Sequence, residues 1–202
     1  MHDPNSLAIR EGVSGRIAKA SPDRRASIID LGCGGGLLLG RLHELGFRNL
    51  TGVGWNIEVP PGGLAVPKTD LAVAGWADRL EGRSFDWVVS AEVLEHLVNP
   101  YQFLVEARRL VAPHGRLLLT FPNVHNWRSI VGYAVSGRFS GFFGPNWNDN
   151  HPLHDQHIFI PNMHLVRYFI GLNKFGAIEV TYLHGRGRLF GQTTMVEARP
   201  VP

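Results

Sequence analysis

An acidic residue followed by alternating glycines is the first part of the chain that could do chemistry. Asp30 closes an apolar run, and Gly32, Gly34 and Gly36 follow at alternate positions. Glycines allow a tight turn that brings backbone N–H groups close to a ligand. Because residue 37 is a leucine, the G-x-G-x-x-G spacing of dinucleotide sites is not met. A carboxylate before the first glycine favours a cationic ligand over a pyrophosphate, and the alternative is a turn that binds nothing.

A second candidate site combines carboxylates with histidines. Glu92, Glu95 and His96 stand at positions i, i+3 and i+4, which lie on one face if the segment begins a helix. Such a group can bind a divalent cation or orient a substrate, and it can also serve packing alone.

A histidine cluster further along the chain supplies possible catalytic groups. His151, His154, Asp155 and His157 lie close together in the sequence. His157, with Asp155 nearby, is the catalytic candidate, because a histidine titrates near neutral pH and can deprotonate a hydroxyl. It is equally a candidate for a fourth metal ligand, whereas His151 and His164 favour surface or packing roles.

The elements that must position these residues alternate between strands and helices, which predicts a parallel sheet covered on both faces. Asn99 and Pro100 suit the start of a helix, which Pro113-His114-Gly115 would end. The last two strands are expected to pair antiparallel. We predict strands at 27–31, 49–53, 85–90, 115–121, 177–182 and 193–198, and helices at 37–45, from 99 and over 168–175.

Two segments do not fit this alternation. Residues 54–67 contain three prolines and several glycines, so we expect an irregular loop or a single turn there. Residues 122–161 are rich in glycine, asparagine, histidine and aromatic residues, which is typical of a lid or binding element. Asn123 and Arg128 are candidate polar contacts to a substrate, and the aromatic residues either cover an apolar acceptor or pack the lid.

Composition indicates one ordinary globular domain over residues 1–202. Hydrophobic residues make up 44% and charged residues 18% of the 202-residue chain. The net charge of +3 suits an anionic substrate without requiring nucleic acid. The single cysteine, Cys33, and an N-terminus without the order of a signal peptide favour a reducing, cytoplasmic location. No apolar run is long enough for a transmembrane helix.

Several motifs resemble those of class I S-adenosylmethionine-dependent methyltransferases. Asp30-Leu31-Gly32-Cys33-Gly34-Gly35-Gly36 is similar to the first family motif, and three later blocks follow in order. Those blocks are 84–90, 92–97 and 110–117. Phe121-Pro122-Asn123, Trp127-Arg128 and Gly137-Arg138-Phe139 further resemble the type 11 and type 23 subgroup. The resemblance implies an α/β Rossmann-like fold: a mostly parallel seven-stranded sheet with a terminal antiparallel hairpin and a lid-like insertion.

The same resemblance implies S-adenosyl-L-methionine as the cofactor. In the family, the second strand usually ends in an acidic residue that accepts the ribose hydroxyls. Here Gly54, Trp55 and Asn56 follow that strand, so Glu58 or Asn56 would have to substitute. The implied cofactor contacts are Asp30, Gly32, Cys33, Gly34, Gly36, Glu58, Asp70, Leu71, Ser90, Ala91 and Glu92.

A metal is a further implication of the resemblance. In small-RNA 3′-terminal methyltransferases a similar histidine completes a metal site with a Glu-x-x-Glu-His segment. The resemblance to ubiquinone-type O-methyltransferases also suggests that this segment binds a metal. The corresponding ligands are Glu92, Glu95, His96 and His157. Many class I methyltransferases carry the segment without a metal, so both readings stay open.

Three functions are compatible with these motifs. The leading hypothesis is methyl transfer to an oxygen or nitrogen atom of a small molecule such as a metabolite, sugar or natural-product intermediate. A metal-assisted RNA 2′-O-methyltransferase is the second, although the chain has no strong basic stripe. A non-catalytic binding or regulatory protein that retains the fold is the third, because the usual ribose carboxylate is missing. The sequence does not name the acceptor, the attacked atom or the oligomeric state.

Overall fold

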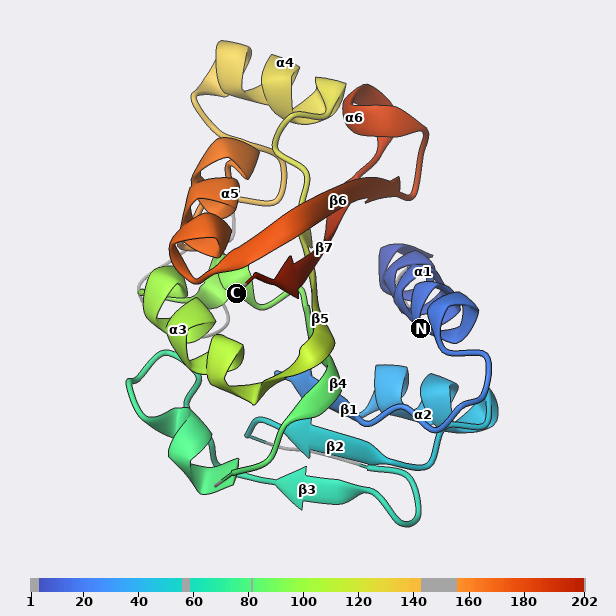
Figure 1. Ribbon diagram of the computed structural model, residues 1–202. Helices are drawn as coiled ribbons and strands as arrows, with labels where there is room; N and C mark the ends of the chain where they lie inside the picture. Colours follow the sequence, from blue (N-terminus) through green and yellow to red (C-terminus); the bar gives the residue numbers. More distant parts are fainter. Residues whose placement is uncertain (1–3, 56–58, 81, 143–155, 202) are drawn as a thin grey trace.

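A seven-stranded sheet forms the centre of the computed structural model, which describes residues 4–55, 59–80, 82–142 and 156–201 (Figure 1). The strand order is β3-β2-β1-β4-β5-β7-β6. The first five strands in this order pair in parallel, and β7 pairs antiparallel with both β5 and β6. The predicted Rossmann-like sheet with a terminal hairpin is therefore confirmed. The strands are β1 Ile28–Leu31, β2 Leu50–Val53, β3 Leu64–Val66, β4 Phe85–Ala91, β5 Val111–Pro122, β6 Phe175–Leu183 and β7 Thr193–Pro200.

Helices cover both faces of this sheet, with α1 and α2 on one side and α3 and α5 on the other (Figure 1). Each side has its own apolar core. Ile9, Val13 and Ile17 of α1 pack with leucines of α2 on the first side, and Phe103 and Ile170 belong to the core of the second. The helices are α1 Pro4–Ala20, α2 Leu37–Glu44, α3 Pro100–Leu110, α4 Trp127–Ser136, α5 Met163–Leu172 and α6 Gly187–Phe190, with 3-10 turns η1 Trp76–Leu80 and η2 Leu94–His96.

Strand register brings the two candidate sites to the same end of the sheet, where the parallel strands have their carboxyl ends. Asp30 of β1 lies opposite Gly52 of β2 and Val89 of β4, all near the carboxyl ends of parallel strands. In open α/β sheets this end is where ligands bind. Among the described residues, no helix has the length and apolar character that crossing a bilayer requires.

Two predicted boundaries were wrong, and one expected loop contains a short strand. The helix from Asn99 ends at Leu110 and β5 begins at Val111, so Pro113-His114-Gly115 lies within a strand. A Cβ on Gly115 would come 2.6 Å from the Phe85 carbonyl oxygen, so this glycine permits close strand pairing. Residues 54–67 were expected to be irregular, but Leu64–Val66 forms a short strand on β2.

The predicted helix over 168–175 was misplaced. Helix α5 runs from Met163 to Leu172, because the Asn162 side chain caps its first turn by accepting from the His164 N–H at 2.9 Å. The chain then turns at Lys174, whose φ is +56°, and Phe175 already belongs to β6. Helix α1 was not predicted at all.

Candidate functional site

The glycine turn after β1 forms the floor of the site. Gly32, Gly34 and Gly36 have φ values of +83°, +50° and +70°, which side chains rarely tolerate. The Gly32 and Cys33 N–H groups both donate to the Val53 carbonyl oxygen, which joins the turn to β2. A Cβ on Gly32 would come 2.5 Å from Val93 Cγ2. The turn is therefore as tight as predicted, and its backbone conformation and close packing favour glycine.

One hollow of about 390 Å³ lies between this turn and helix α1. Asp30, Gly32, Cys33 and Gly34 line it, together with Ala91 and Glu92. Burial raises the pKa of Asp30 from 3.8 to about 7. A cationic group bound beside this carboxyl would stabilise its ionised form. Burial, with the charge of Asp30 second, also raises the pKa of the Cys33 thiol to about 12, so that group stays neutral.

Sequence reasoning missed the contribution of α1 to this hollow. Ser6, Ile9, Arg10 and Val13 line it from the other side, at helical spacing on one face. The spacing of Ile9, Val13 and Ile17 was the available signal. Arg10 brings a guanidinium to the same hollow as the carboxylates of Asp30 and Glu92, so the hollow presents one positive and two acidic groups.

A second hollow of about 440 Å³ lies on the other side of the glycine turn. Asp70 and Leu71 line it as predicted, next to Gly54 and Trp55 at the end of β2. Glu58 and Asn56 lie outside the described residues. Ser90 is fully buried and lies outside the lining of both hollows, so its contact with the cofactor stays a prediction. Gly36 lines a separate hollow of about 540 Å³ between α1 and α2.

A smaller hollow of about 200 Å³ lies beneath the start of α4. Arg128, His157 and Gln192 are among the polar groups around it. Asn123 also lines it, but its amide donates to the carbonyls of Arg188 and Gly191, so this predicted substrate contact is occupied in holding the chain. Glu92 lines the hollows of about 390, 440 and 200 Å³, and it therefore stands where these three meet.

The backbone at Glu92 is held in an unusual conformation. Its φ is +54°, which is uncommon for a residue with a side chain. The Glu92 N–H donates to the Thr120 carbonyl oxygen at 3.1 Å, and the Thr120 hydroxyl donates to Glu92 Oε1 at 2.9 Å. Burial raises the pKa of Glu92, and the Thr120 hydrogen bond opposes this shift. Sequence reasoning missed Thr120.

Glu95, His96 and His157 form a compact cluster beside Glu92. One possible metal-ligand atom of each residue lies within 4.8 Å of the other two. The two imidazole rings pack edge to face, with their centroids 4.7 Å apart. The N–H groups of Ile158 and Phe159 donate to the Glu95 carbonyl oxygen, which fixes the segment that carries His157. Three of the four predicted metal ligands thus come together, and Glu92 lies outside this group.

The cluster has a property that a cation would relieve. Glu95 is fully buried, and neither of its carboxylate oxygens has a hydrogen-bond partner among the described residues. Burial, with the Glu92 charge second, raises the pKa of Glu95, because an isolated buried carboxylate is costly. Burial also lowers the pKa of His157, so its imidazole is neutral near pH 7. Asp155, the other catalytic candidate, lies outside the described residues, as do His151 and His154.

Comparison with known proteins places this geometry in context. A family model described as a methyltransferase domain matches residues 8–164. The mitochondrial ubiquinone biosynthesis O-methyltransferase of Arabidopsis thaliana is 34% identical over 129 residues, which are 58% of this chain and 37% of that protein. The ubiquinone biosynthesis O-methyltransferase of Dechloromonas aromatica is 33% identical over 146 residues, which are 68% of this chain and 59% of that protein. The chain thus spans less than two thirds of each of these relatives.

A solved structure agrees in fold. The 1,6-didemethyltoxoflavin-N1-methyltransferase of Burkholderia thailandensis, with bound 1,6-didemethyltoxoflavin and S-adenosylhomocysteine, superposes with a TM-score of 0.62. The alignment covers 96% of this chain and 79% of that one at 17% identity. At this identity the likeness establishes the shared fold.

Proposed function

Because the chain belongs to the methyltransferase domain family, we propose that it transfers a methyl group from S-adenosyl-L-methionine to an oxygen atom of a small-molecule acceptor. The observation that carries this proposal is the position of Glu92. This residue lines the two hollows on either side of the glycine turn, and it also lines the polar hollow of about 200 Å³. The first two suit the two halves of the cofactor, and the third suits an acceptor.

Charge supports the orientation of the cofactor. The buried Asp30 carboxylate suits the ammonium group of the methionine part, and the Arg10 guanidinium on α1 suits its carboxylate. Asp70 and Leu71 then face the adenosine part in the second hollow. Glu58 stays our candidate for the ribose hydroxyls. The relatives that are named as O-methyltransferases favour oxygen over nitrogen as the methylated atom.

The protein has few chemical tasks in this reaction. The bound cofactor supplies a methyl group that its sulfonium already activates. The chain aligns the acceptor oxygen with that methyl group and receives the acceptor proton. His157 lines the acceptor hollow and is neutral near pH 7, so it is the base in this proposal. Asp155 and the lid role of 122–161 remain part of the same proposal.

A divalent cation fits the cluster next to this hollow. Glu95, His96 and His157 would hold it, and its charge would compensate the Glu95 carboxylate that has no partner. Bound there, a cation lowers the pKa of a hydroxyl. With His157 as a ligand, the same imidazole would not serve as the base, so removing and restoring the metal distinguishes its two roles.

The direct test is calorimetric titration of the purified protein with S-adenosylhomocysteine. We expect micromolar binding in the wild type and a loss of at least about tenfold in Asp30→Asn, which removes the charge that faces the ammonium group. Asp23→Asn is the matched control, because Asp23 is exposed in a turn away from the hollows. Absence of binding in the wild type at millimolar ligand would contradict the proposal and favour a non-catalytic member of the family.

A further inference from the structure

Helix α4 carries its apolar stripe on the side that faces solvent. Trp127, Val131 and Val135 follow one another at intervals of four residues, so they lie on one face. These side chains are 46%, 51% and 83% exposed. Ser129, which is buried, lies on the opposite side of the helix. A helix on a globular domain normally buries its apolar stripe, so α4 is oriented for contact with something outside the described chain.

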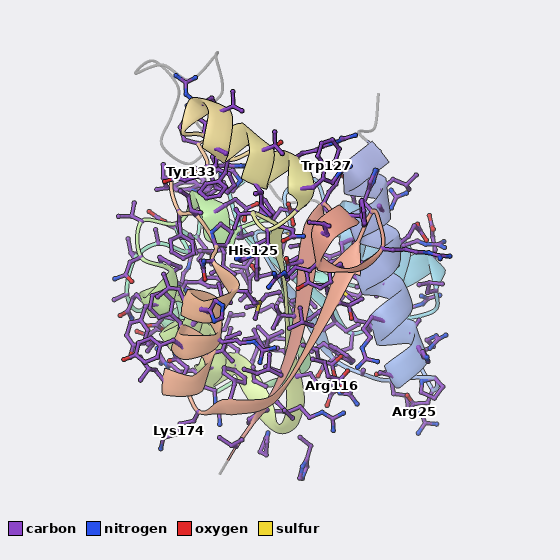
Figure 2. The ribbon with its side chains drawn as sticks, turned by 90° about the horizontal axis from the view of Figure 1, so that it is seen from above. Arg25, Arg116, His125, Trp127, Tyr133 and Lys174 are labelled. Carbon is purple, nitrogen blue, oxygen red and sulfur yellow. The ribbon has the colours of Figure 1, made fainter. Side chains whose placement is uncertain are left out.

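Helix α6 extends this surface. Leu189 and Phe190 are 48% and 60% exposed, and α6 lies beside the start of α4 (Figure 1). The two segments are fixed to each other, because Asn123 donates to the Arg188 carbonyl oxygen at 2.7 Å and to that of Gly191 at 2.8 Å. Figure 2 shows α4 at the edge of the molecule, with Trp127 near α6. We define the α4–α6 face by Trp127, Ile130, Val131, Val135, Leu189 and Phe190.

The charged side chains of residues 122–142 and 183–192, which carry this face, have one sign. Arg128, Arg138, Arg186 and Arg188 are exposed on the same two segments. Residues 122–142 and 183–192 contain no aspartate or glutamate. Exposed aliphatic side chains, an interfacial tryptophan and arginines are the combination that binds the headgroup region of a bilayer. Contact between two copies of this face would instead bring arginines together, which costs free energy.

From these observations we infer that the α4–α6 face docks the protein on an anionic lipid bilayer. The apolar side chains enter the headgroup region and the four arginines pair with lipid phosphates. Arg128 belongs to α4 and also lines the hollow of about 200 Å³, so that hollow adjoins the docked face in this arrangement. The inference stands on the surface alone and does not require methyl transfer.

Co-sedimentation with vesicles tests it. Vesicles of phosphatidylcholine with about one third phosphatidylglycerol should bind the wild type, pure phosphatidylcholine should bind it more weakly, and salt should weaken the first interaction. Arg186→Gln with Arg188→Gln should lower the affinity by roughly ten- to thirtyfold. Val131→Ser with Val135→Ser should lower it at least about tenfold. Circular dichroism and melting curves check that each variant is folded.

Matched controls use residues far from the face. Arg25→Gln removes an exposed arginine on the opposite side of the molecule (Figure 2), and Val98→Ser removes a valine that is 67% exposed outside α4 and α6. Neither should change vesicle binding. Equal binding by the controls and the face variants would overturn the inference. It would also be overturned if the wild type did not bind vesicles and instead formed dimers in sedimentation velocity. Binding of RNA in place of vesicles, with the same dependence on Arg186 and Arg188, would overturn it too.

Discussion

The Thr120 hydroxyl donates to the carboxylate of Glu92 at 2.9 Å, while the Glu92 N–H donates to the Thr120 carbonyl oxygen. These contacts link β5 to the first residue after β4. They hold the backbone of Glu92 at a positive φ and point its carboxylate to the place where three hollows meet. Thr120 is therefore a positioning residue for the proposed reaction.

Replacing Thr120 with valine tests this role with little change in shape. Loss of a hydrogen bond to a charged group costs about 1.5–3 kcal/mol, so we expect kcat to fall about ten- to hundredfold. The pKa of Glu92 should also rise, because the hydroxyl no longer opposes the effect of burial. A shifted pH profile separates this effect from general destabilisation. Thr181→Val on exposed β6 is the control, and an unchanged kcat and pH profile in Thr120→Val would refute the positioning role.

Asp30 makes ligand-free stability depend on pH. Its pKa is about 7 in the folded protein against 3.8 in a free chain, so the folded state binds the proton more tightly. Its contribution to stability is therefore greatest below the unfolded value and is lost as pH rises through about 7. Asp30→Asn should raise the free energy of unfolding relative to wild type by up to about 3 kcal/mol more at about pH 8 than at about pH 5.

Urea denaturation of both proteins at the two pH values measures this difference. Effects of Glu92 and Glu95 are common to both proteins and cancel in the comparison. The contribution of Asp30 to stability grows as pH falls, but the affinity of the wild type for S-adenosylhomocysteine should fall below about pH 7. The reason is that a protonated Asp30 no longer attracts the ammonium group. A stability difference that is the same at both pH values would show that the Asp30 carboxyl is not perturbed.

Local patterns made the centre of the fold predictable. The Asp30 turn, the strands beside it and the antiparallel end follow from short apolar runs and glycines. Helix α1 was missed because Gly12 and Gly15 lower its helix propensity and outweighed the helical spacing of its apolar residues, while tertiary packing supports it. Gly12 allows close packing there, since a Cβ would come 2.7 Å from Leu183 Cδ2 and the leucine side chain would have to shift. Neighbours along the chain do not encode such a contact.

The site shows the same division. Its residue types could be predicted, but its contacts depend on register between strands. Thr120 reaches Glu92 because Ala91 of β4 lies opposite Thr120 of β5. His157 reaches Glu95 through backbone hydrogen bonds between segments about sixty residues apart in the chain. The missing member of the metal group, Glu92, is separated from the others because Thr120 holds it.

Metal binding should depend on Glu95. Addition of a divalent cation to chelator-treated protein should raise the melting temperature of the wild type, because a cation compensates the buried carboxylate. Glu95→Gln should bind the cation at least about tenfold more weakly. Its own stability without metal should not fall, since Gln removes a charge that has no partner. Calorimetry with Mg²⁺, Mn²⁺ and Zn²⁺ measures the affinity.

Glu44→Gln controls for the loss of an exposed carboxylate on α2. If no cation binds and a chelator leaves activity unchanged, the cluster holds no metal, and His157 is then free to act as the base. If chelation abolishes activity and metal restores it, His157 is a ligand instead. The two outcomes assign different roles to one side chain.

Glu197 should couple the stability of the sheet to cofactor binding. This buried carboxylate of β7 accepts from Arg16 of α1 at 2.6 Å and from Arg116 of β5 at 2.7 Å. Glu197→Gln removes the negative charge and replaces one of the two acceptor oxygens with an NH2 group that faces an arginine, so we expect a loss of about 3 kcal/mol in urea denaturation. Because α1 also carries Arg10, S-adenosylhomocysteine affinity should fall as well. Arg16 also pairs with exposed Glu179, so Glu179→Gln is the matched control and should cost less than about 1 kcal/mol. Equal effects of the two substitutions would show that α1 is held by its apolar face alone.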